Sequence, residues 1–165
     1  MITLREARGE DAPAIGALWN PLIRDTDVTF WPAERSEADI AAHIAERQAA
    51  GHPFLLAEED GALLGYASYG QFRGGPGYAR SMEHSVNLAA AARGRGIGRM
   101  LMQAIEDHAR ACGHRLMIGA ITATNSGSLR FHARLGYTEW GRIPAAGWKF
   151  GRYHDLVLMG KDLGG

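Results

Sequence analysis

The chain has 165 residues, of which 46% are hydrophobic and 22% are charged, and its 18 basic residues balance its 18 acidic ones. This length and composition are typical of one globular unit, so residues 1–165 are expected to form a single domain. Zero net charge argues against a generally basic nucleic-acid-binding protein, and no apolar run approaches the roughly 18 residues that a membrane span needs. The charged N-terminus lacks the apolar stretch of a secretory signal, which favours a cytoplasmic location.

The first part of the chain predicts a strand and two helices. Residues 2–7 alternate between apolar and polar side chains, as a half-buried strand does. Asp11, two residues before a proline, marks the start of a helix that runs to about Ile23. A second helix is expected from Ser36 to Ala50, where Gly51 supplies the stop.

Three strands and a glycine-rich loop are expected next. The runs 54–57 and 62–69 are strand-like, and Asp60-Gly61 between them is a strong hairpin signal. Residues 71–78 are rich in glycine and read as a loop, after which a strand is expected over 82–88.

The second half alternates between helices and strands. From Ile97 the apolar residues recur with helical spacing, and Gly113 ends that helix. The later segments are a strand at 115–120, a helix at 126–135, and strands at 137–143 and 155–159 that flank a loop at 145–152. The whole order, β-α-α-β-β-β-α-β-α-β-β, predicts an α/β fold with a mixed sheet covered by helices.

Residues 93–99, Arg-Gly-Arg-Gly-Ile-Gly-Arg, stand between the 82–88 strand and the long helix. Backbone N–H groups at a helix N-terminus bind phosphate, and glycines let the phosphate approach the main chain. Three arginines without an acidic residue add positive charge there, although a plain glycine-rich turn with solvated arginines is the alternative. The segment is not a P-loop, because no Gly-Lys-Ser/Thr follows, and its spacing is wrong for a dinucleotide fingerprint.

This segment and the order of elements resemble the GNAT superfamily of N-acetyltransferases over nearly the whole chain. Arg93, Gly96 and Gly98 fill the family's Gln/Arg-x-x-Gly-x-Gly/Ala pattern for the acyl-CoA pyrophosphate. The resemblance implies the GNAT fold, acetyl-CoA as co-substrate, and backbone contacts of residues 86–88 to the pantetheine arm and thioester carbonyl. The implied cofactor contacts are Val86, Asn87, Leu88, Arg93, Gly94, Arg95, Gly96, Ile97, Gly98, Arg99, Asn125 and Ser128.

A closer resemblance is to the phosphinothricin and methionine sulfoximine acetyltransferase branch. It is carried by residues 65–70, 83–86, 129–137 and 149–156. Asn87 departs from the aromatic residue that is usual in this branch. The branch implies acetylation of the α-amino group of a free amino acid such as methionine sulfoximine, methionine sulfone or phosphinothricin.

Two side chains are candidates for acid–base chemistry. Glu83 lies on the strand that leads to residues 93–99, and a carboxylate there can deprotonate an amine, directly or through water. A solvated strand glutamate is the alternative. His132 stands where many relatives carry a tyrosine thought to protonate the departing thiolate, and its alternative is a packed helix histidine.

The substrate-binding candidates come from three segments. A guanidinium can bind a carboxylate bidentately, so Arg73 is the expected clamp, and Phe30 and Trp31 are possible apolar walls. Loop arginines and aromatics are, alternatively, ordinary surface and core residues. The expected contacts are Phe30, Trp31, Arg73, Gly74, Gly75, Glu83, His84 and Ser85, with Lys149 and Tyr153 as weaker candidates.

No metal is expected, because the seven histidines show no metal-ligand spacing. Cys112 falls on the apolar stripe of its helix and is expected in the core. The resulting function is an acetyl-CoA-dependent N-acetyltransferase in which the amine attacks the thioester directly. A peptide N-terminal or polyamine acetyltransferase, or a non-catalytic acyl-CoA-binding module, are the alternatives. A homodimer is what the resemblance suggests.

Overall fold

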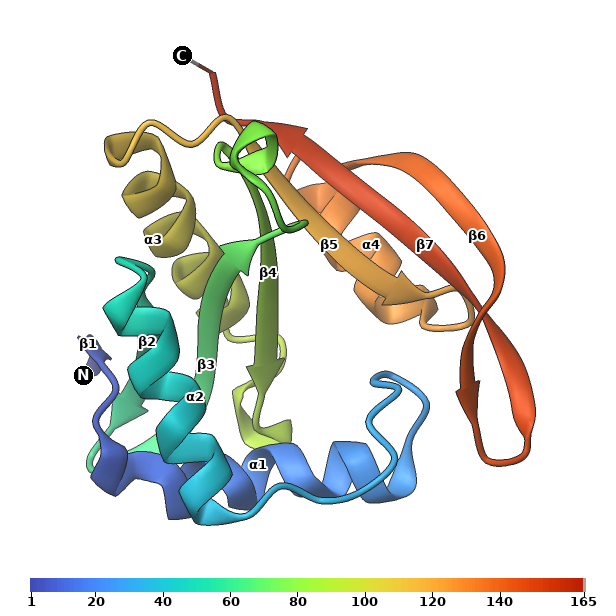
Figure 1. Cartoon of the computed structure of the whole chain (residues 1–165). Coiled ribbons are helices and arrows are strands. Elements are labelled where there is room, and N and C mark those ends of the chain that lie inside the picture. The colour runs from blue at the N-terminus through green and yellow to red at the C-terminus, as the bar shows by residue number, and fades with distance from the viewer. Residues whose placement is uncertain (165) are drawn as a thin grey trace.

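The computed structural model describes residues 1–164 and arranges them as one mixed sheet with helices on both faces (Figure 1). The predicted order of strands and helices is confirmed. Short 3-10 turns at Gly9–Asp11, Pro76–Tyr78 and Ala90–Ala92 are additional. The elements are β1 (Ile2–Glu6), α1 (Ala12–Asp25), α2 (Glu37–Ala49), β2 (Phe54–Glu59), β3 (Ala62–Gln71), β4 (Ser81–Leu88), α3 (Ile97–Ala111), β5 (Leu116–Thr122), α4 (Ser126–Arg134), β6 (Thr138–Lys149) and β7 (Arg152–Asp162).

The strands follow the order β1-β2-β3-β4-β5-β7-β6 in the sheet. Each neighbouring pair is antiparallel except β4 and β5, which run parallel. These two strands pair only over Ser81–Glu83, opposite Leu116–Ile118. Beyond Glu83 the ribbons separate, as Figure 1 shows, so the last half of β4 has a neighbour on one side only.

Helices α1 and α2 cover one face of the sheet, and α3 and α4 cover the other (Figure 1). Side chains of β3 alternate between the two faces, as the period of a strand requires. Tyr66 packs with the residues of α1 and α2, whereas Ala67 and Tyr69 pack with those of α3. Within residues 1–164, no helix has the length and apolar character needed to cross a membrane.

The predicted start signals of the two N-terminal helices act in different ways. Ser36 caps α2, because its Oγ accepts a hydrogen bond of 3.1 Å from the backbone N–H of Asp39. Asp11 precedes α1, but its carboxylate accepts from the N–H of Arg8 at 2.7 Å and pairs with Arg5 at 2.7 Å. It therefore closes the preceding turn rather than capping the helix.

The C-terminal hairpin differs from the prediction of a loop over 145–152. In the structure β6 and β7 continue to within two residues of each other, and Lys149 pairs with Arg152. Phe150 and Gly151 form the turn with φ values of 55° and 70°. Positive φ at both central residues is the turn geometry that suits a two-residue hairpin, but Phe-Gly lacks the usual Asn-Gly or Asp-Gly signal. A register shift between Ile143 and Gly147 further hides the alternation of the strand.

The expectation that Cys112 belongs to the core is wrong, because this residue is exposed. It follows the last residue of α3 and serves as the C-cap, with its N–H bonded to the carbonyl of His108 at 3.0 Å. The apolar stripe of α3 thus reaches the core only as far as Ala109, which is fully buried. Spacing along a helix does not show where the core beneath it ends.

Candidate active site

Glu83 is half-buried on β4, opposite Gly70 of β3, at the last position where β4 pairs with β5. It lies on the face covered by α2, close enough for the charge of Arg47 to act on it. Burial raises the pKa of the Glu83 carboxyl, and the positive charge of Arg47 partly opposes this rise. A carboxylate with a raised pKa is a stronger base than an exposed one, which is what deprotonation of an amine requires.

Beyond Glu83, the backbone of β4 offers hydrogen-bond donors toward β5. The N–H of Ala89 bonds to Leu64 of β3, at 2.8 Å, and bonding to the same side alternates along an antiparallel ladder. By this alternation Asn87 points its N–H at β3, whereas Val86 and Leu88 point theirs away from it. Since β5 has separated by this point, the N–H groups of Val86 and Leu88 have no strand partner.

The side chains of Ser85 and Asn87 share the Glu83 face of β4. Ser85 is exposed. The Asn87 amide donates to the hydroxyl of Tyr66 at 2.8 Å, which ties this side chain to the sheet. Asn87 therefore has a structural partner where the related branch carries an aromatic residue.

The segment 93–99 places a helix N-terminus just after β4. Gly94 and Gly96 adopt φ values of 74° and 79°, and no atom lies within 4 Å of a Cβ built on either. The first intrahelical bond of α3 runs from Met100 to Gly96, so the N–H groups of residues 97–99 are free to bind a ligand. Open space above glycine backbone, with N–H donors at a helix N-terminus, fits a diphosphate.

The other residues of this segment differ in their surroundings. Arg95 forms an ion pair of 2.7 Å with Glu59, whereas Arg93 and Arg99 are exposed. Gly98 is buried for a different reason, because a Cβ there would lie 2.9 Å from the ring of Phe131. It permits close packing of α3 on α4 rather than approach of a ligand.

The N-terminus of α4 holds the second predicted cofactor region. Asn125 caps this helix, since its Oδ1 accepts from the N–H of Ser128 at 3.2 Å. The carbonyl of Ser128 in turn lies 2.7 Å from Nδ1 of His132. The structure therefore links Asn125 and Ser128 to His132 through the first turns of one helix.

His132 and His84 form a buried pair between α4 and β4. Their Nε2 atoms lie 2.8 Å apart, and each residue is at most 6% exposed. A carbonyl can only accept, so Nδ1 of His132 carries the proton and its Nε2 accepts from Nε2–H of His84. Burial lowers the pKa of His84 to about 3 and also lowers the pKa of His132, so both rings are neutral.

The two histidines need close approach of the backbone behind them. A Cβ at Gly119 of β5 would lie 2.9 Å from the ring of His84 and 3.3 Å from Nε2 of His132. His84 thus occupies the α3–α4 face, opposite Glu83. The structure does not bring His84 together with Glu83 and Ser85 as one set of substrate contacts.

The loop over residues 26–35, between α1 and α2, carries the predicted aromatic walls. Phe30 is half-buried and stacks on His154 of β7, with ring centroids 5.7 Å apart. Trp31 is 48% exposed, and the guanidinium of Arg35 lies 4.3 Å from its ring. Lys149 donates to two carbonyls of this loop, at 2.7 and 2.8 Å, and so fastens it to the β6–β7 hairpin.

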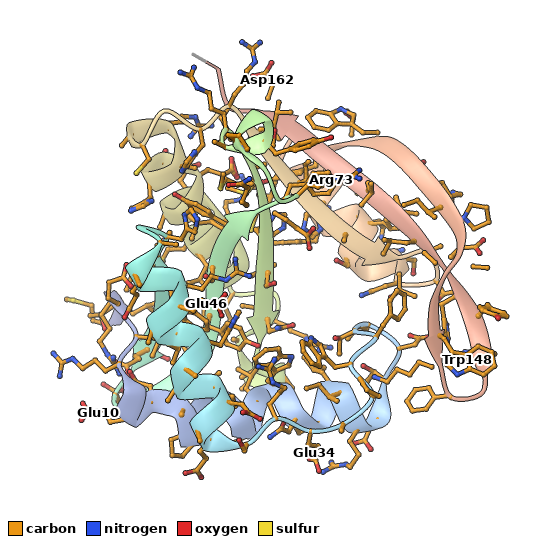
Figure 2. The ribbon with its side chains drawn as sticks, viewed as in Figure 1. Glu10, Glu34, Glu46, Arg73, Trp148 and Asp162 are labelled. Atoms are coloured by element: carbon orange, nitrogen blue, oxygen red, sulfur yellow. The ribbon has the colours of Figure 1, made fainter. Side chains whose placement is uncertain are left out.

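Arg73, Gly74 and Gly75 lie on the exposed loop after β3. The Arg73 guanidinium stands 5.7 Å from the ring of Tyr78. Figure 2 places Arg73 near the start of β4 and Trp148 at the far tip of the β6–β7 hairpin. Tyr153 packs on Trp148, with ring centroids 4.8 Å apart, and is 68% exposed. The structure does not gather Arg73 and Tyr153 around one point.

Arg47 is the residue that the sequence analysis missed. Its side chain reaches from α2 to Gly70, where a side chain would occupy the space that the guanidinium fills. The signal was present in the spacing, because Ile40, Ile44 and Arg47 stand at i, i+4 and i+7 and so share the buried face of α2. An arginine on that face is pointed at the sheet.

A pocket of about 490 Å³ lies elsewhere, between the 26–35 loop and the hairpin tip, and its lining includes neither Glu83 nor residues 93–99. Among residues 1–164, no three His, Cys, Asp or Glu side chains are grouped to hold a metal ion.

A half-buried carboxylate on a strand with free N–H donors, next to a helix N-terminus that fits a diphosphate, is the arrangement expected of an acyl-CoA-dependent transferase. The chain belongs to the acetyltransferase (GNAT) family, whose model matches residues 19–137. It is therefore an N-acetyltransferase that uses acetyl-CoA.

Individual relatives agree over nearly the full length. A Salmonella typhimurium L-methionine sulfoximine/L-methionine sulfone acetyltransferase is 37% identical over 159 residues, which are 96% of this chain and 92% of that protein. The structure of a phosphinothricin acetyltransferase from Sinorhizobium meliloti in complex with acetyl-CoA is 32% identical, with a TM-score of 0.92, covering 99% of this chain and 89% of that one. A ribosomal-protein-alanine N-acetyltransferase from Brucella melitensis is 36% identical, with a TM-score of 0.93, covering 97% and 99%.

Proposed function

We propose that this protein acetylates the α-amino group of a small free amino acid of the methionine sulfoximine, methionine sulfone or phosphinothricin type. The observation that carries the proposal is the position of Glu83. It stands where β4 leaves β5, with free N–H groups of the same strand on one side and residues 93–99 at its end. The names of the relatives supply the substrate class.

The chain's own groups divide the reaction between them. Bound acetyl-CoA supplies an activated thioester. Glu83 takes a proton from the substrate ammonium, and the neutral amine attacks the thioester carbon without an acyl-enzyme. The N–H groups of Val86 and Leu88 hold the carbonyl oxygen as it gains negative charge. The C–N bond forms as the C–S bond breaks, the sulfur leaves as a thiolate, and the proton that the acylated nitrogen then loses passes through water to that thiolate.

The acid role expected for His132 has little support in its surroundings. Its Nδ1–H is bonded to the carbonyl of Ser128, and its Nε2 accepts from His84. A thiolate with a pKa of about 8.5 is a good leaving group, so the step needs little acid catalysis. We propose that water protonates the thiolate and that His132 with His84 holds α4 against β4.

Two rival substrates remain for the same chemistry. The Brucella relative is named for acetylation of an alanine of ribosomal protein, which favours a peptide substrate. A polyamine needs an acidic surface, whereas the side chains around Glu83 include the cation of Arg47. Between the amino acids, the neutral sulfoximine and sulfone side chains require less cationic compensation than phosphinothricin does.

Release of coenzyme A tests the proposal. With acetyl-CoA and L-methionine sulfone or sulfoximine, the protein should release coenzyme A at a rate proportional to enzyme. Tight binding of acetyl-CoA without amine-dependent release would instead make it a non-catalytic acyl-CoA-binding module.

We also propose a cytoplasmic homodimer. The β6–β7 hairpin exposes large apolar side chains that a second copy would cover, among them Trp140, Ile143, Trp148, Phe150 and Tyr153. Light scattering should return twice the chain mass of 17.9 kDa, and a monomeric mass at micromolar concentration would refute the dimer.

A further inference from the structure

Arg47 brings a positive charge to the inner side of α2, beside Glu83. The guanidinium lies over Gly70, and Gly70 is the direct cross-strand partner of Glu83. Positions that pair directly on one face are the nearest neighbours across two strands. The cation and the carboxylate therefore border the same small region of the sheet surface.

This guanidinium lacks a partner within the described residues. Its Nε is buried without a hydrogen bond, and burial lowers the pKa of Arg47. Glu46 and Glu83 act on it through charge alone, and Glu46 is exposed. Its other titratable neighbours, His43 and His52, have pKa values lowered first by their own burial, so they add little positive charge that could attract an anion, and Arg47 supplies that charge.

A half-buried guanidinium is favourable only when an anion completes its hydrogen bonds. The Glu83 carboxylate is near but acts on the guanidinium through charge alone, so the hydrogen-bonding capacity of Arg47 is left for a further group. In a free α-amino acid, one carbon joins the ammonium to the carboxylate. An amine presented to Glu83 therefore carries its carboxylate to the neighbouring position, on the Arg47 side.

We propose that Arg47 binds the α-carboxylate of the amino acid substrate. This assignment rests on the proposed function, and it deepens it, because a free amino acid is selected over amines that lack an adjacent carboxylate. A polyamine and a peptide N-terminus have no such group and would leave the guanidinium unpaired. Arg73, in contrast, is exposed and lies over Tyr78, so it is free to contact the more distant end of the substrate.

The test compares two substrates that differ only in the carboxylate: L-methionine sulfone and its α-carboxamide. For the Arg47→Gln variant, kcat/KM on the amino acid should fall about 30-fold or more, mainly through KM, because a buried charge-assisted pair is lost. On the carboxamide it should change less than about threefold. Arg47→Lys keeps the charge that acts on Glu83 but loses the bidentate geometry. Its kcat/KM on the amino acid should therefore lie between the values of the wild type and of Arg47→Gln.

Two controls separate a binding role from a structural one. Arg8→Gln removes an exposed arginine whose partner, Glu10, is also exposed, and it should leave kcat/KM on both substrates unchanged. Thermal unfolding monitors the fold of each variant, and Arg47→Lys provides the comparison if Arg47→Gln does not fold. Equal losses on both substrates would overturn the assignment, as would loss of carboxylate preference in Arg73→Gln and not in Arg47→Gln. A wild-type enzyme that acetylates neither compound would refute the proposed function itself.

Discussion

Glu83 is the proposed general base. Its carboxylate is half-buried, and burial raises its pKa while the charge of Arg47 restrains the rise. An ordinary exposed carboxylate has a low proton affinity and is a poor base for an ammonium. Partial burial raises that affinity and so favours the proposed proton transfer.

Replacement of Glu83 by glutamine keeps the shape of the side chain and removes the base. We expect kcat/KM to fall about 10²–10⁴-fold at neutral pH, with partial recovery at high pH, where more of the substrate amine is already neutral. The wild type should lose activity as pH falls through the raised pKa of Glu83, at a pH above the usual carboxyl value of about 4.3. Full activity of Glu83→Gln between about pH 6 and 9 would show that another group or water is the base.

The His84–His132 pair ties stability to pH. In the unfolded chain both rings titrate near pH 6.5, whereas burial lowers the pKa of His84 to about 3 and that of His132 in the same direction. Stability is therefore fully present above pH 6.5 and falls as pH decreases toward 3, because the unfolded chain then binds protons that the native pair excludes.

Denaturant unfolding at a series of pH values checks this linkage. The free energy of unfolding should fall between about pH 6.5 and 5, and it should fall less steeply in the double variant His84→Gln/His132→Gln. The single variant His132→Ala leaves the Nε2–H of His84 buried without its acceptor, which costs about 1–3 kcal/mol. An unchanged pH slope in the double variant would mean that the pair is protonated in the native state.

Among the elements, the junction of β4 with α3 is the proposed cofactor site. Its donors are backbone N–H groups, which a side-chain substitution does not remove. Substitutions that change the charge beside these donors should therefore weaken binding more than substitutions that keep it. Arg93 and Arg99 are exposed and available, while Arg95 is already paired with Glu59. The three arginines are therefore expected to contribute unequally to cofactor binding.

Calorimetric titration with coenzyme A measures that series without turnover. Arg93→Gln and Arg99→Gln should each weaken binding about tenfold, as expected when a hydrogen bond to a charged group is lost, and Arg95→Gln should weaken it less. Gly96→Val should weaken binding and also destabilise the fold, because φ at this position is 79°. Wild-type affinity in both Arg93→Gln and Arg99→Gln would remove these arginines from the cofactor site.

The elements also show what could be predicted from sequence. Strong local sequence signals were enough to predict the 60–61 turn, the α2 cap at Ser36 and the glycine-rich turn before α3. The β6–β7 hairpin was missed where its turn, Phe150-Gly151, lacks the common residues and its ladder shifts register. The prediction that Cys112 lies in the core was wrong for a related reason, since helical spacing carries no information about the end of the core.

Prediction of the site was limited by contacts that join distant segments. The resemblance indicated Glu83 and residues 93–99, which lie close together along the chain. The spacing along α2 could place Arg47 on the buried face of that helix. Its position beside Glu83 follows only once the strands are paired, because the partner of Glu83 across the sheet is Gly70 and the guanidinium lies over Gly70. In the same way, His84 and His132 are 48 residues apart and meet only in the folded chain.

On the scale of the whole molecule, separation of β4 from β5 is the feature on which the proposed site depends. It frees the N–H groups of Val86 and Leu88, and it brings the end of β4 and the start of α3 to one place. Helices α1 and α2 cover the face of the sheet on which Glu83 lies (Figure 1). In the proposed function, cofactor and amine therefore meet from different sides of β4.

A competition experiment tests this account most directly. The protein is given acetyl-CoA and an equimolar mixture of L-methionine sulfone, L-methionine sulfoximine, phosphinothricin, spermidine and a peptide with an N-terminal alanine, and mass spectrometry follows the acetylated products at low conversion. The α-N-acetyl derivatives of the free amino acids should dominate from the first time point, with the two sulfur compounds ahead of phosphinothricin. Faster acetylation of the peptide or of spermidine than of all three amino acids would contradict the account.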